Sequence, residues 1–196
     1  MQVVATLGHA LGFSLAAGVN LYATVAILGL ASRFGWVDLP GRFAVFDSNA
    51  VIAVALGLYV VEFVADKIPW VDSLWDVVHT LIRPLGGAFI AVASLGEATP
   101  LTQGLMALVG GSVAAGAHLT KASTRAAANT SPEPVSNWAL SLAEDGFVVG
   151  LGVLTLSYPV AAFVVSSVLV LLILCFLGVI SRAAWRWLGR RSQPAT

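Results

Sequence analysis

The chain alternates between long apolar stretches and short segments that carry charge. Residues 1–32 contain no Asp, Glu, Lys or Arg, and residues 146–181 form a second uncharged stretch. A helix needs about 20 apolar residues to cross roughly 30 Å of hydrocarbon. Each stretch is therefore long enough to contain a membrane-spanning helix.

The pattern predicts an all-α, polytopic transmembrane bundle of six helices. Pro159 divides the second uncharged stretch, because proline cannot donate a hydrogen bond in a helix interior. Ser131 followed by Pro132 is a typical helix start and begins the fifth helix. The predicted helices are 3–32, 48–66, 72–95, 101–125, 132–156 and 159–181, and residues 182–196 form a basic tail.

Composition supports the membrane class. The chain is 58% hydrophobic and 10% charged, whereas soluble domains average about 45–50% apolar and about 25% charged residues. These values exclude a soluble globular domain, and the single Cys175 excludes an internal disulfide. Ten basic residues balance ten acidic ones, so nothing favours binding to nucleic acid.

Positive charge predicts the orientation, because basic residues accumulate on the cytoplasmic side. With six spans, the two termini share one side of the membrane. That side carries seven of the ten basic residues and the other side two: Lys67, Lys121, Arg125, Arg182, Arg186, Arg190 and Arg191 against Arg33 and Arg42. We therefore expect both termini to be cytoplasmic.

An internal repeat is a further prediction. Helices 48–66 and 101–125 both end near a lysine, Lys67 or Lys121, and Pro and then Trp follow each of them. A parallel repeat of the two helix hairpins, 48–95 and 101–156, would account for this likeness, and some transporters contain such repeats.

Ionisable residues inside the predicted spans are the candidates for function. A charge at the bilayer centre costs about 2.5–3.5 kcal/mol, so it normally faces the bundle interior and has a partner. Spacings of three and four residues place these groups on one face of each helix. The candidate ion or solute pathway consists of Asn20, Glu62, Asp66, Asp76, His79, Arg83, His118, Lys121, Glu144 and Asp145. We expect Arg83 to lie near the midplane, paired with Glu144 or Asp145, in a cluster open to the cytoplasm.

Structural roles are the alternative for several of these residues. Asp66 and Asp76 also fit a salt-bridge set with Lys67 and Lys121, and the two pathway histidines fit hydrogen-bonded core positions better than metal sites. Metal binding stays open for acidic pairs such as Asp72 and Asp76. No nucleophile or cofactor motif is present, so we expect no cofactor.

Three stretches of the chain together carry a family resemblance. They are residues 17–22 (Ala-Gly-Val-Asn-Leu-Tyr), residues 61–83 from Val61 to Arg83, and residues 118–145 from His118 to Asp145. In order and context they resemble an uncharacterised bacterial integral membrane family, the domain of unknown function 4126. The resemblance covers nearly the whole chain and implies a multi-pass protein of the bacterial inner membrane. It implies no activity.

Ionisable faces on four helices favour a transporter or channel for a small ion or polar solute. One alternative is a membrane enzyme or lipid head-group binder, in which Asp72, Asp76, His79 and Arg83 engage a phosphate. Another is a non-catalytic assembly partner. A water-filled cavity reaching Arg83 favours transport, whereas a dry, fully paired cluster favours assembly. Expected partners are the lipid bilayer, the ion or solute, and a second copy of the chain.

Overall fold

The computed structural model describes residues 1–36, 41–130 and 135–191. These residues form seven α-helices, one 3-10 helix and no strand, which confirms the all-α prediction. The elements are α1 (Gln2–Val19), α2 (Leu21–Arg33), η1 (Gly41–Asp47), α3 (Asn49–Ala65), α4 (Pro69–Ala93), α5 (Pro100–Ala128), α6 (Val135–Ser157) and α7 (Pro159–Arg191). The predicted start of the fifth helix at Ser131 lies outside the described residues, as does the end of the basic tail.

Four of the described helices are long and apolar enough to cross a membrane. They are α1, α4 from Trp70, α6, and α7 as far as Arg186. Helices α2 and α3, with 13 and 17 residues, are shorter apolar helices. The chain therefore has the character of a helical membrane protein, but the predicted count of six spans is not confirmed.

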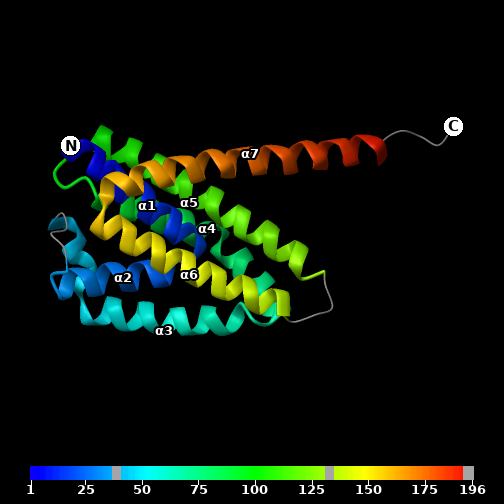
Figure 1. Ribbon diagram of the computed structural model, residues 1–196, viewed down its shortest axis with the longest axis horizontal. Coiled ribbons are helices and arrows are strands. Elements are labelled where there is room, and N and C mark those ends of the chain that lie inside the picture. Colours follow the sequence, from blue (N-terminus) through cyan, green and yellow to red (C-terminus); the bar gives the residue numbers. More distant parts are fainter. Residues whose placement is uncertain (37–40, 131–134, 192–196) are drawn as a thin grey trace.

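The first predicted helix is in fact two helices that fold back at Asn20 (Figure 1). The Asn20 backbone is extended (φ −147°, ψ 100°), and its side-chain oxygen accepts the Ala23 amide at 2.9 Å as the N-cap of α2. Helix α2 returns toward the start of α1, where the His9 ring lies 6.4 Å from that of Phe43 in η1. The prediction of one helix over 3–32 is wrong, because asparagine competes with helical hydrogen bonding and favours a cap.

The hairpin of α1 and α2 changes where the termini lie. A Cβ at Gly8 would meet the carbonyl of Pro159, so α1 begins beside the start of α7. Helix α7 then runs for 33 residues toward the opposite end of the molecule (Figure 1). The start of α1 and the end of α7 therefore lie at opposite ends of the described molecule, whereas a single first helix and six spans would bring them to the same end. The predicted basic tail is helical as far as Arg191.

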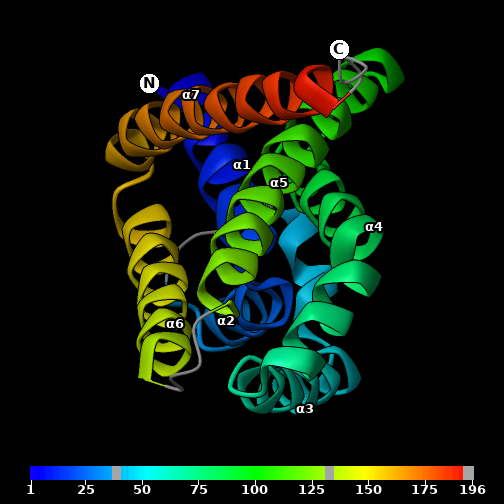
Figure 2. The ribbon, with the colours of Figure 1, turned by 90° about the vertical axis from the view of Figure 1, so that its right-hand side faces the viewer.

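Helix α1 is the centre of the bundle and packs against α4, α5, α6 and α7 (Figure 2). In its apolar window 56% of the residues are buried, against 6% in that of α7. Close approach depends on Gly18, where a Cβ would meet the carbonyl of Ala114 and the methyl of Ala117 on α5. Polar groups beside α1 are therefore enclosed by protein, whereas most of α7 is exposed on the surface.

Candidate functional site

The fold-back of α1 and α2 places residues 19–22, here called the hairpin tip, among charged side chains from α3, α4, α5 and α6. All ten predicted pathway residues contact one another or the hairpin tip. The charged side chains, here called the charged cluster, are Glu62, Asp66, Asp72, Asp76, Arg83, Lys121, Arg125, Glu144 and Asp145. Seven of them are buried and the last two are half-buried.

Arg83 is fully buried and lies between two carboxylates. Its Nη2 is 2.7 Å from Glu62 Oε1 on α3, and its Nη1 is 3.3 Å from Asp76 Oδ1, seven residues earlier on α4. The expected pairing with Glu144 or Asp145 is wrong. Helix α4 packs mainly on α5, and α6 packs mainly on α1 and α7, so Arg83 does not meet the two carboxylates of α6.

The hydrogen bonds of His118 fix its protonation. Arg83 Nη1 donates to His118 Nδ1 at 2.7 Å, since a guanidinium has no acceptor. His118 Nε2 therefore carries the proton and donates to the hydroxyl of Thr80 at 3.2 Å, which in turn donates to the Asp76 carbonyl at 3.0 Å. His118 is a neutral member of the network, and no three His, Cys, Asp or Glu of the described residues are placed to hold a metal ion.

Two further basic side chains, both on α5, complete the charged cluster. Arg125 forms a two-point bond to Glu144, at 3.0 and 2.7 Å, and its Nη2 lies 3.2 Å from Asp66 Oδ2. Lys121 is 3.0 Å from Asp66 and 3.3 Å from both Glu62 and Glu144. Arg125 was missing from the predicted pathway, because it was counted among the basic residues of the cytoplasmic side. Its four-residue spacing from Lys121 places both side chains on one face of the helix and was the available signal.

Two polar contacts join the hairpin tip to the charged cluster. Lys121 Nζ donates to the carbonyl of Val19, the last residue of α1, at 3.3 Å. Asn20 Nδ2 donates to Asp145 Oδ1 at 3.3 Å, while Asn20 Oδ1 caps α2. The break between α1 and α2 is thus held by two contacts. The Lys121 ammonium binds the Val19 carbonyl, and the Asp145 carboxylate binds the Asn20 side chain.

Tyr22 makes a third contact between the tip and α4. His79 Nδ1 lies 2.7 Å from the Trp75 carbonyl and must donate to it, so His79 Nε2 accepts the Tyr22 hydroxyl at 2.9 Å. The Trp75 ring stacks on His79 with centroids 4.7 Å apart. Tyr22 was also missing from the predicted pathway, because a tyrosine in an apolar run carries no charge to mark it.

A small pocket of about 180 Å³ between α4 and α5 reaches the charged cluster from outside. Its lining includes Asp72, Asp76, Thr80, His118 and Arg125. Asp76 and His118 both contact Arg83, which does not itself line the pocket. A water molecule occupies about 30 Å³ in the liquid, so a few waters fit there. The pocket therefore gives water access to the edge of the charged cluster at Asp76 and His118, but it does not extend to Arg83.

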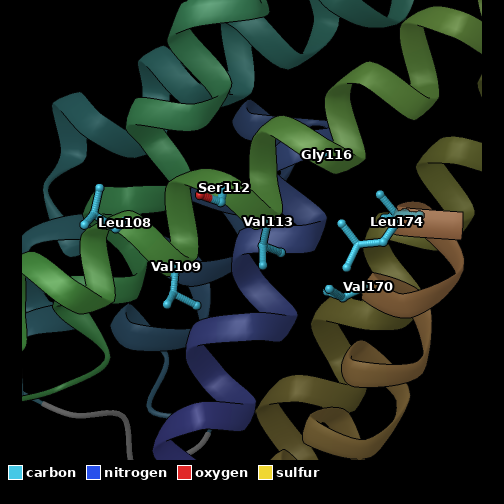
Figure 3. A pocket seen from close by; sticks show the side chains of 8 residues that line it. Leu108, Val109, Ser112, Val113, Gly116, Val170 and Leu174 are labelled. Carbon is cyan, nitrogen blue, oxygen red and sulfur yellow. The ribbon is translucent and has the colours of Figure 1, made fainter. Parts of the chain in front are cut away.

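A second cavity, an apolar groove of about 360 Å³ between α5 and α7, differs in character (Figure 3). Its lining residues are Leu108, Val109, Ser112, Val113, Gly116, Val170, Ile173 and Leu174. Because none of them is ionisable, this groove is not suited to an ion.

The two lysines that suggested an internal repeat lie in different surroundings. Lys67, in the turn between α3 and α4, donates to the Phe63 carbonyl at 2.9 Å and to the Ser141 hydroxyl at 3.2 Å. Its ammonium also lies 3.0 Å from the centre of the Phe63 ring, and burial lowers its pKa. Lys121 instead lies among carboxylates, so the repeat is not confirmed.

Comparison with known proteins finds a family whose model covers the whole site. The family model described as "Domain of unknown function (DUF4126)" matches residues 7–178, which include the hairpin tip and the whole charged cluster. No curated protein and no solved structure matches the chain.

Proposed function

Since the chain belongs to the DUF4126 family, whose description gives no activity, we propose its function from the geometry of the site. The protein is a membrane transporter or channel for a small ion, and the ion site lies at the hairpin tip. The observation that carries this proposal is the interruption of a helix at Asn20 beside a buried charged cluster. Non-helical backbone inside a membrane occurs where it is buried in protein or lines a cavity, and transporters place ion sites at such breaks.

The topology that goes with this function has a re-entrant hairpin, α1 and α2, and five crossing helices, α3 to α7. Of these five, α4, α6 and α7 are long and apolar enough to span, and α3 and α5 cross beside them. Basic residues support a cytoplasmic position for the end at which α7 finishes: Lys67, Arg182, Arg186, Arg190 and Arg191, against Arg33 and Arg42 at the other end. The C-terminus is then on the cytoplasmic side of the inner membrane. The N-terminus is on the opposite side. The pocket at Asp76 opens in the cytoplasmic half.

Binding of a lipid phosphate is less well supported than transport. In that alternative Arg83 engages the phosphate, but its guanidinium is fully buried and paired with Glu62 and Asp76. A phosphate would have to displace both carboxylates.

A non-catalytic assembly partner is the second candidate, and the pairing of the cluster favours it. Arg83 and Arg125 each lie between two carboxylates, and buried ion pairs contribute little net stability but in some proteins fix which arrangement forms. The double variant Arg83→Met with Glu62→Met separates the candidates. An assembly partner keeps its cellular phenotype without the pair, whereas a transporter loses it.

Ion flux in proteoliposomes tests the proposal. Purified protein is reconstituted, and gradients of H⁺, Na⁺, K⁺, ammonium and chloride are followed with ion-sensitive dyes. We expect the wild type to dissipate one of these gradients faster than protein-free vesicles, and Asp145→Asn to change that rate, because Asp145 holds the tip. Glu97→Gln, an exposed change outside the cluster, is the control and should keep the rate. Wild-type vesicles no faster than protein-free ones for every ion would contradict transport.

A further inference from the structure

We propose that the position of the Lys121 ammonium is a site for a monovalent cation of the size of K⁺ or ammonium, which the lysine occupies as a tethered substitute. The inference rests on the proposed function and deepens it, because it names the class of ion and the atoms that bind it.

Four oxygen atoms surround Lys121 Nζ, and each comes from a different place in the chain. They are the Val19 carbonyl at 3.3 Å, Glu62 Oε1 at 3.3 Å, Asp66 Oδ2 at 3.0 Å and Glu144 Oε2 at 3.3 Å. We call these four the oxygen cage. An ammonium group has three N–H donors, so four acceptors exceed what the lysine satisfies.

The distances in the oxygen cage indicate the size of cation that fits it. The cage holds the Lys121 ammonium with contacts of 3.0–3.3 Å to its three carboxylates. Oxygen ligands lie about 2.0–2.1 Å from Mg²⁺ and about 2.3–2.6 Å from Ca²⁺. The cage is too wide for either ion, and a large, weakly hydrated monovalent cation fits it better.

The kinds of ligand in the cage also favour a cation. Val19 ends α1, so its carbonyl belongs to the negative end of the helix dipole. Carbonyls at the ends of broken helices coordinate cations in transporters, and carbonyl rings replace the hydration shell of K⁺ in channels. The hairpin therefore supplies a ligand that a continuous first helix would keep in its own hydrogen bonds.

Two carboxylates of the cage have unused capacity. Among the described residues, Glu62 Oε2 and Asp66 Oδ1 are buried and have no hydrogen-bond partner. The side chains of Glu62 and Asp66 are 0% and 3% exposed. Buried polar atoms nearly always have a partner, so each of these carboxylates keeps one oxygen with capacity for a further hydrogen bond or ligand.

The charge balance points the same way. Within ion-pair distance, four carboxylates share three basic side chains: Glu62, Asp66, Asp76 and Glu144 against Arg83, Lys121 and Arg125. When all are ionised, one negative charge remains, and a second appears when the Lys121 ammonium leaves the cage. A monovalent cation is therefore attracted to the position that the ammonium vacates.

The test is whether a cation replaces the missing ammonium in purified Lys121→Ala. Its Tm is measured in about 0.1 M KCl, ammonium chloride, NaCl and choline chloride, which share one ionic strength and one Debye length of about 10 Å. We expect Tm to be higher in KCl or ammonium chloride than in choline chloride, by about 3–6 °C at about ten times the Kd. The wild type should show a smaller difference between the salts, because its own Lys121 ammonium competes with the cation for the cage.

Two variants control for effects of charge and salt. Lys67→Ala removes an ammonium that lies outside the oxygen cage, on the Phe63 carbonyl and the Ser141 hydroxyl, so its Tm should not depend on the cation. Glu144→Gln in the Lys121→Ala background removes one charged ligand of the cage and should abolish the salt-specific rise.

The proposal is overturned if Lys121→Ala has the same Tm in all four salts, or if the Lys67→Ala control responds equally. If Lys121→Ala does not accumulate, Lys121→Gln replaces it, and failure of both to accumulate in ammonium-containing buffer also overturns the proposal. If the wild type shows ion flux but Lys121→Ala shows no cation-specific rise in Tm, the cation site is wrong and the transport proposal is unaffected. If Lys121→Ala shows the rise but the wild type shows no ion flux, the cation site is supported and the transport proposal is wrong.

Discussion

At the scale of single residues, stability depends on how charges are paired where water is absent. Arg83 and Glu62 are both 0% exposed, whereas the surface pair Arg33 and Asp47 is 32% and 39% exposed. Breaking a buried pair leaves an uncompensated charge and costs about 3–5 kcal/mol. An exposed pair contributes about 0–1 kcal/mol. A pair of arginine and carboxylate therefore contributes more to stability at the buried place than at the exposed one.

Arg83→Met should lower the free energy of unfolding by about 3–5 kcal/mol, because Glu62 and Asp76 lose their buried partner. Arg33→Met is the matched control and should cost less than about 1 kcal/mol. Denaturation of the two variants in the same detergent measures both values. Equal losses would mean that Arg83 is hydrated in the folded protein.

Asn20→Asp should destabilise the protein near neutral pH, because it places a second carboxylate against Asp145 while keeping the capping oxygen. Asn49→Asp, at the exposed first turn of α3, is the control and should be neutral or slightly stabilising. Thermal unfolding of the two variants compares them. A stable Asn20→Asp protein would show that Asp145 is not ionised beside the tip.

Helical spacing predicted most members of the site but not their partners. Periodicity identifies the face on which Asp76, His79 and Arg83 lie, since it depends on one helix alone. Which helix that face meets depends on packing, and Arg83 meets Glu62 of α3 rather than Glu144 of α6. Partner choice is a tertiary property, and a single sequence does not contain it.

At the scale of elements, one residue changes the path of the chain. Residues 1–32 have the length and apolarity of one spanning helix, and apolarity alone does not separate one helix from two. Asn20 ends α1 and caps α2, so the two helices form a hairpin. An asparagine in an apolar run was the available signal, and it was interpreted only as a polar ligand.

Gly18→Leu should destabilise the protein by about 1–3 kcal/mol, because the larger side chain separates α1 from Ala114 and Ala117 on α5. Gly57→Leu is the matched control. At Gly57 a Cβ would meet no described atom within 4 Å, so the added side chain enters open space. Unfolding of both variants measures the difference, and a neutral Gly18→Leu would contradict the close packing of the hairpin.

At the scale of the whole molecule, composition was sufficient for the membrane class, and family membership confirms the resemblance. The sides of the termini stay a prediction, because side assignment counts spans and the first predicted helix is divided into α1 and α2. With α1 and α2 as a hairpin, the N-terminus lies beside the start of α7, and the C-terminal end of α7 lies at the far end (Figure 1).

The sidedness of the two termini tests the re-entrant hairpin, on which the ion site depends, most directly. Single cysteines replace Gln2 and Trp185 in separate Cys175→Ala proteins, and a membrane-impermeant thiol reagent is applied to intact cells and to inverted vesicles. We predict that the two cysteines react from opposite sides of the membrane. Reaction of both from the same side would contradict the hairpin and restore a single spanning helix over residues 3–32.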